Sequence, residues 1–110
     1  MKLQHGQVLT KHEVKRTGND KQTLVNESQT EVLGPFSVAE IHAEVRASLR
    51  VTISENYHSA TLECAVMLPV DPTADATQHG YEWAHDFCTR NINEKMKGVR
   101  KGLRNLAQNA

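Results

Sequence analysis

Residues 39–70 have the sequence AEIHAEVRASLRVTISENYHSATLECAVMLPV, and the alternation in this stretch decides the fold. Between Ala39 and Ile53 the apolar residues occupy every second position, with polar or charged residues between them. Strict alternation with a period of two is typical of a β-strand that has one buried face and one face in water. The pattern therefore predicts a long strand over residues 39–53.

A second alternating run follows the short polar segment at residues 54–59. We expect its inward side chains to be Ala60, Leu62, Cys64, Val66, Leu68 and Val70, and its outward ones Thr61, Glu63, Ala65 and Met67. Two adjacent strands joined by a short loop pair as an antiparallel hairpin. At about 3.3 Å per residue each arm approaches about 40 Å, so the hairpin needs a covering element.

The rest of the chain predicts that element, a long C-terminal helix. Pro69 and Asp71-Pro72 end the second strand, and Thr73 or Asp75 can cap a helix, the latter in a capping-box pattern with Gln78. An apolar stripe should pack on the hairpin, made by Tyr81, Ala84, His85, Cys88, Ile92, Met96, Val99, Leu103 and Leu106. The predicted fold class is α+β, a long antiparallel β-hairpin packed on a long helix.

Residues 1–34 predict an N-terminal β arm. Strand patterns at residues 7–16 and 21–25 flank the turn signal Gly18-Asn19-Asp20, which favours a second hairpin. Residues 26–30 are polar enough for a loop, and Gly34-Pro35 is the strongest break in the chain. We therefore expect an arm over residues 1–34 and a hairpin-plus-helix body over residues 35–110, within one small domain.

The order of these features resembles that of small uncharacterised proteins encoded by tailed phages and related mobile elements. The features are the first alternating strand, Asn56-Tyr57 in the turn, the second strand, Pro69, Asp71-Pro72 and an aromatic-containing helix. The resemblance covers about residues 45–100, and this turn lacks a glycine before Asn56. It implies a phage or host-takeover context, and the family brings no established activity to this chain.

The charge is balanced in total and unbalanced along the chain. The 110 residues carry 13 Lys and Arg against 13 Asp and Glu, which excludes a protein that coats nucleic acid by bulk positive charge. Residues 39–89 carry two basic and eight acidic side chains, whereas residues 90–110 carry six basic and one acidic, a net +5. Such a block is typical of a solvated helix face or of one half of an attraction between subunits.

No motif predicts an enzyme or a cofactor. His79, Glu82, His85, Asp86 and Cys88 lie close in sequence, but no pair has the two-histidine spacing of four that binds zinc on one helix face. His85 and Cys88 lie on the predicted apolar stripe, where a thiol is inert. We expect two free cysteines, no metal site and no catalytic residues. Residues 1–6 lack the apolar core of a signal peptide, and no run reaches the length of a membrane span, so we expect a cytoplasmic protein, in the host cytoplasm if a phage encodes it.

Trp83 and Phe87 lie four residues apart on the side of the predicted helix opposite the stripe. Exposed aromatics on an amphipathic helix favour a partner. One candidate is a second copy of the chain, with Gly98 and Gly102 allowing close approach of helices. The other is single-stranded nucleic acid, stacked on these aromatics and contacted by Arg90, Lys97, Arg100, Lys101 and Arg104.

The two partners are compatible if an oligomer presents both helices. We therefore expect a non-enzymatic phage-type accessory protein that forms a homo-oligomer and binds single-stranded nucleic acid. The alternative is an inhibitor of a host or defence system that binds a protein, or a small molecule held between subunits.

Overall fold

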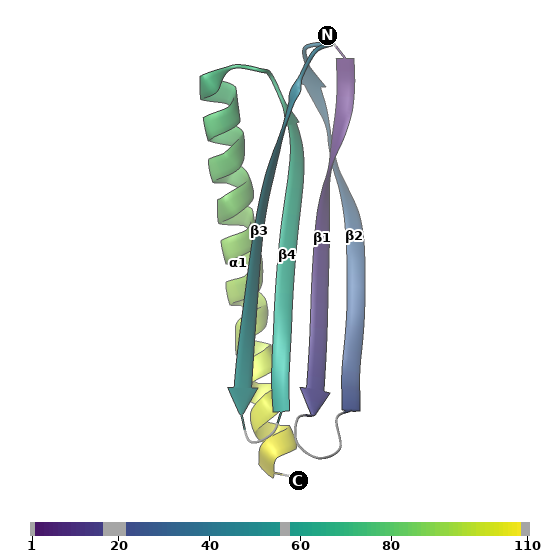
Figure 1. The fold of residues 1–110 in the computed structure, drawn as a ribbon, viewed down its shortest axis with the longest axis vertical. Coiled ribbons are helices and arrows are strands. Elements are labelled where there is room, and N and C mark those ends of the chain that lie inside the picture. Colours follow the sequence, from purple (N-terminus) through teal and green to yellow (C-terminus); the bar gives the residue numbers. More distant parts are fainter. Residues whose placement is uncertain (1, 17–21, 56–57, 109–110) are drawn as a thin grey trace.

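The computed structural model describes residues 2–16, 22–55 and 58–108 and has the α+β fold expected from the sequence. Its elements are β1 (Lys2–Arg16), β2 (Gln22–Val38), β3 (Ala43–Glu55), β4 (His58–Val70) and α1 (Ala74–Gln108). The four strands form one antiparallel sheet in the order β2-β1-β4-β3, and α1 lies along one face of it (Figure 1). The molecule is elongated, with extents of 57 × 19 × 19 Å.

The predicted hairpin of β3 and β4 is confirmed, with Val51 opposite Leu62 and Ala47 opposite Val66. The predicted inward residues of β4 are buried between the sheet and α1, except Val70, which is half-buried. The predicted turn at Asn56-Tyr57 lies outside the described residues. Alternation therefore predicted the inward face of both strands correctly from Ala43 onward.

The predicted first strand begins too early. β3 starts at Ala43, and Ile41, which was expected to face inward, is 84% exposed. Residues 39–42 belong to the connection that carries the chain from β2, at one edge of the sheet, to β3 at the other. The Ala39 N–H donates a hydrogen bond of 2.8 Å to Asp71 Oδ1, which fixes this connection beside the start of α1.

The N-terminal arm is an integral part of the sheet. β1 pairs with β4 from Gln7 opposite Met67 to Arg16 opposite His58, so β1 and β4 are the two central strands. The predicted loop at residues 26–30 is wrong, because β2 continues through it. The expected boundary at Gly34-Pro35 also falls within β2, while the predicted turn at residues 18–20 lies outside the described residues.

Gly34 and Pro35 are compatible with β2 because β2 is an edge strand. A proline on an edge strand need not remove a hydrogen bond of the ladder. Gly34 has φ +99°, a conformation that side chains rarely allow. The β1–β2 register also shifts between Gln4 and Gly6, as expected for an irregular strand end. The Gly34-Pro35 pair, which normally ends a strand or helix, therefore lies within β2 because β2 is at the edge of the sheet.

α1 begins after Thr73, whose Oγ1 accepts a 3.1 Å hydrogen bond from the Ala76 N–H. This is an N-cap, so the first of the two predicted caps is confirmed. Gln78 donates to Glu82 instead of completing a capping box with Asp75. The helix covers β3 and β4, and among the described residues its backbone does not approach β1 or β2 as closely (Figure 1).

The predicted apolar stripe is correct in the middle of the helix and wrong at its start. Ala84, Cys88, Ile92 and Leu103 are buried, and Met96 and Val99 pack against the core. Tyr81 and His85 are exposed and stack on each other with ring centroids 6.2 Å apart. The side chain of Leu106 lies outside the described residues.

Candidate nucleic-acid interface

The outer face of α1 carries a row of cationic side chains. At about 100° per residue, Arg90, Lys97, Lys101 and Arg104 fall within a sector of about 60° that points away from the sheet. All four are exposed, and none forms an ion pair with another described residue. We call these four residues the basic row. Over residues 90–104 it extends for about 21 Å at 1.5 Å per residue.

Two other cations of the helix lie outside the row. Arg100, which the sequence placed with the phosphate contacts, is exposed but turned about 80° from Arg90. Lys95 lies beside His12 and Glu27 of the sheet. Glu94 lies about 20° beyond the edge of this sector, on the side of Lys101, and lowers the local net charge. The structure therefore gathers four of the five predicted phosphate contacts on one face.

Trp83 and Phe87 form a stacked pair, with ring centroids 5.4 Å apart and an angle of 27° between the rings. Trp83 is 43% exposed and lies in the same sector as the basic row. Phe87 differs from the prediction, because it is half-buried and packs against the core instead of lying opposite the stripe. Its ring supports the indole from one side, so Trp83 is the aromatic that can contact a ligand.

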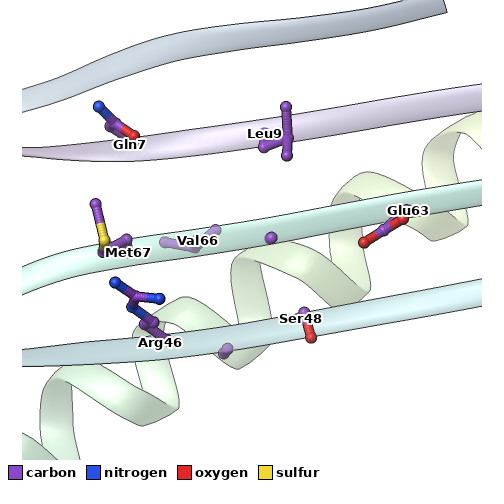
Figure 2. Close-up of a pocket in the computed structure, with 9 residues that line it drawn as sticks. Gln7, Leu9, Arg46, Ser48, Glu63, Val66 and Met67 are labelled. Atoms are coloured by element: carbon purple, nitrogen blue, oxygen red, sulfur yellow. The ribbon is translucent and has the colours of Figure 1, made fainter.

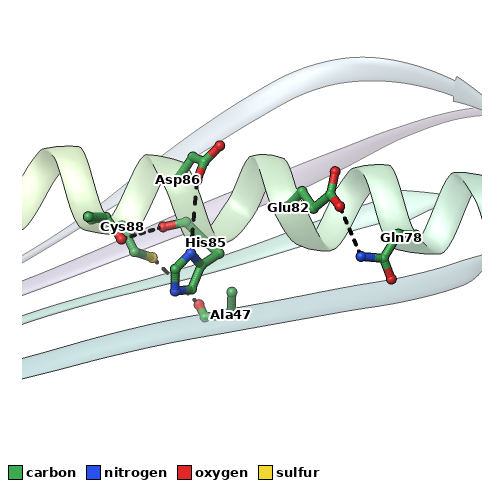
Figure 3. A network of polar contacts seen from close by, with 7 residues as sticks. Ala47, Gln78, Glu82, His85, Asp86 and Cys88 are labelled. Carbon is green, nitrogen blue, oxygen red and sulfur yellow. Dashed lines mark hydrogen bonds and ion pairs between the residues drawn. The ribbon is translucent and has the colours of Figure 1, made fainter.

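The polar cluster at the start of α1 does not converge on a common point. His85 Nδ1 lies 3.9 Å from Asp86 Oδ1, and Gln78 Nε2 donates a 3.0 Å hydrogen bond to Glu82 (Figure 3). These side chains are exposed, and Cys88 points to the sheet instead. No three His, Cys, Asp or Glu side chains of the described chain are placed so as to hold a metal ion.

The two cysteines are free and meet in the core. The Cys88 S–H donates to the Cys64 carbonyl oxygen, 3.3 Å from Sγ. The Ala47 carbonyl oxygen lies 3.7 Å from Sγ on the neighbouring strand (Figure 3). Burial, together with a smaller contribution from the neighbouring Cys64, raises the pKa of Cys88 to about 12, and burial also raises the pKa of Cys64. Both thiols stay protonated at neutral pH, so neither is a nucleophile.

No element of the described chain covers the sheet face opposite α1, which carries both polar and apolar side chains. A shallow hollow of about 520 Å³ crosses it, and Gln7, Met67 and Arg46 lie in one line across β1, β4 and β3 (Figure 2). An antiparallel sheet commonly leaves such a polar face in water. The hollow holds no buried charged side chain, so it is a weaker candidate than the basic row.

A groove of about 580 Å³ lies on the other side of the sheet, between α1 and the part of β1 and β2 that α1 leaves uncovered. Val14, Val25, Leu62, Val99 and Leu103 give it an apolar lining, and His12, Glu27 and Lys95 form its polar rim. The groove was not predicted from the sequence, because the first two strands were expected to form an arm separate from the body. The alternation of Val8, Thr10, His12 and Val14 is the signal for the inward face of β1.

Comparison of the chain with models of protein families, with curated proteins and with solved structures found no match. The resemblance to phage-encoded proteins therefore stays a prediction. α1 is long, but neither it nor any other helical segment of the described chain is apolar enough to cross a membrane.

Proposed function

We propose that the protein is a non-enzymatic accessory protein that binds single-stranded nucleic acid through the outer face of α1. The observation that carries the proposal is the basic row, four exposed cations on one face with no ion pair to another described residue. Unpaired cations in a line match the repeating negative charge of a phosphate backbone. The local +5 charge supplies an attraction that the zero total charge conceals.

The exposed indole of Trp83 should make this surface bind single-stranded nucleic acid more tightly than a duplex. An exposed indole stacks on an unpaired base whatever its identity, and such stacking contributes about 1–3 kcal/mol per base. Bases in a duplex are stacked on each other and do not offer this contact. Because Phe87 holds the indole, little freedom of the Trp83 side chain is lost on binding.

The test is binding of labelled single-stranded DNA and RNA of mixed sequence, measured by fluorescence anisotropy over a series of salt concentrations. Four phosphate contacts predict that the logarithm of the association constant falls with the logarithm of salt with a slope of about −2.8. Lys97→Glu with Lys101→Glu should reduce the slope to about −1.4 or abolish binding. Quenching of Trp83, the single tryptophan, gives a second readout.

The matched control is Lys2→Glu with Arg50→Glu, which changes the net charge by the same amount on exposed positions of the sheet. Its salt slope should equal that of the unmodified chain. If neither nucleic acid binds at low salt, or if the control loses as much affinity as the helix variant, the basic row is not a nucleic-acid interface.

A further inference from the structure

One flank of α1 carries aromatic side chains near its start and two glycines with open space beside them near its end. Trp83 and Phe87 lie on this flank near the start of the helix, and Gly98 and Gly102 lie on it near the end. A Cβ atom added to either glycine meets nothing within 4 Å, so packing within the chain does not require them. Each glycine costs about 1 kcal/mol in a helix relative to alanine. The two glycines keep space open beside the helix.

The spacing of the two pairs is the same. Trp83 and Phe87 are four residues apart, as are Gly98 and Gly102. If two copies of α1 lie side by side in opposite directions, a register that places Trp83 against Gly102 also places Phe87 against Gly98. The same register occurs twice across a two-fold axis, so both ends of both helices are filled.

The charges of α1 favour this antiparallel direction. Residues 74–89 carry three acidic side chains and no Lys or Arg, whereas residues 90–108 carry six basic and one acidic. An antiparallel pair brings each acidic half beside a basic half, while a parallel pair brings the two basic halves together. The register also places Arg90 near Glu94 of the other copy, and neither side chain is in an ion pair with another described residue.

We infer that this flank of α1 is a homodimer interface in which a second copy packs its helix antiparallel, with Trp83 and Phe87 of each chain seated over Gly102 and Gly98 of the other. The contact extends over residues 83–102, about 28 Å of helix. The groove over β1 and β2 lies on the side of Gly98 and Gly102 and gives the second copy room to approach. The dimer covers the same Trp83 indole that the proposed nucleic-acid complex uses for stacking, so a base stacked on Trp83 competes with this contact.

The first test measures the mass of the chain by sedimentation equilibrium over a wide range of concentration. The unmodified chain should reach twice its 12.3 kDa mass. Gly98→Leu with Gly102→Leu should raise the dissociation constant at least about ten-fold, because side chains then fill the space that receives the aromatics. Both substitutions favour the helix itself, so circular dichroism should show a fold at least as stable as before.

The matched control is Asn93→Ala, which favours the helix at an exposed position away from this flank. It should leave the dissociation constant unchanged. A species of 12.3 kDa at every concentration, or a dimer that the leucine variant does not weaken, overturns the inference.

The second test determines direction and register by disulfide trapping. Chains with Trp83→Cys are mixed with chains carrying Gly102→Cys and treated with a mild oxidant, diamide. In the antiparallel dimer the two new cysteines face each other, while the second Trp83–Gly102 contact of the mixed dimer stays intact. Diamide takes up the two electrons and two protons lost by the pair of thiols.

The expected result is a covalent dimer in the mixture and none with either variant alone, where the two new thiols lie about 28 Å apart. The native cysteines are buried and do not compete. A covalent dimer formed by each variant with itself indicates parallel helices and contradicts the inference, as does the absence of any cross-link.

Discussion

At the scale of single residues, the contact between Cys64 and Cys88 shows how packing sets chemistry. Both thiols are almost fully buried where β4 meets α1, and the pKa of Cys88 rises to about 12 because burial disfavours the thiolate. The sequence identified the two cysteines as free thiols and placed both facing inward. Their direct proximity could not be predicted, because it depends on how α1 lies along the strand.

The raised pKa values predict a loss of stability at high pH. In the unfolded chain a thiol ionises near pH 9.0, whereas in the folded chain Cys88 stays protonated to about pH 12. The unfolded state then binds fewer protons, so the free energy of unfolding falls as pH rises between these values, by up to about 1.4 kcal/mol per pH unit for each thiol. Urea unfolding from pH 7 to pH 11 measures the decline.

Cys88→Ala is the comparison for this prediction. It removes one of the two contributions, so its free energy of unfolding should fall less steeply above pH 9 than that of the unmodified chain. Equal slopes for the two proteins would show that Cys88 does not ionise differently in the two states.

At the scale of elements, the strands that α1 covers were the ones that the sequence predicted correctly. β3 and β4 alternate strictly because α1 covers one of their faces and water contacts the other. β2 lies at the edge, beyond the helix, and its inward positions include Glu27, Gln29 and Glu31, so no alternation shows through residues 26–31. The strand is held by pairing with β1, a long-range interaction that a local pattern does not contain.

The existence of α1 was predicted correctly, but the residues by which the start of the helix contacts the sheet were not. Ala84, Cys88, Ile92 and Met96 follow one another at intervals of four, and each such step turns about 40° round the helix. The contact line therefore drifts, as expected for a straight helix on a twisted sheet. At the start of α1 the line passes through Ala76 and Gly80, which leaves Tyr81 and His85 exposed.

The helix glycines predict stability changes of opposite sign. A Cβ on Gly80 would lie 2.7 Å from Cγ1 of Val70, a stiff, half-buried side chain packed against the core, so Gly80→Ala should lower the free energy of unfolding by about 1–2 kcal/mol. Gly98→Ala, where space is open, should raise it by up to about 1 kcal/mol. Thermal unfolding at low protein concentration compares them, and equal shifts of the midpoint would contradict the packing.

At the scale of the whole molecule, the acidic and basic side chains are concentrated in different parts of the chain. The zero total is a cancellation between an acidic middle region, which includes all of β3 and β4, and the basic end of α1, which packs against one end of these two strands. The residues of the proposed interface could be identified from the sequence, since Trp83, Phe87 and the glycines were all visible there. Their common flank could not be established, because Phe87 was placed on the wrong side of the helix.

The proposed dimer should weaken as sodium chloride rises. Attraction between the acidic and basic halves of two helices acts across exposed surface, and the screening length falls from about 10 Å at 0.1 M salt to about 3 Å at 1 M. Sedimentation equilibrium at the two concentrations measures the change in dissociation constant. A dimer that is tighter at 1 M salt would show that apolar contact alone drives association.

The central position of β1 has a consequence for how the chain is made. β1 is synthesised before the other three strands, yet its second neighbour in the sheet is β4, which ends at Val70. Until that residue has left the ribosome, the newly made β1 and β2 have one unsatisfied inner edge and no core to cover it. Because pairing across such a separation is slow, the emerging N-terminal hairpin is the part of the molecule that is most exposed to a chaperone or to aggregation.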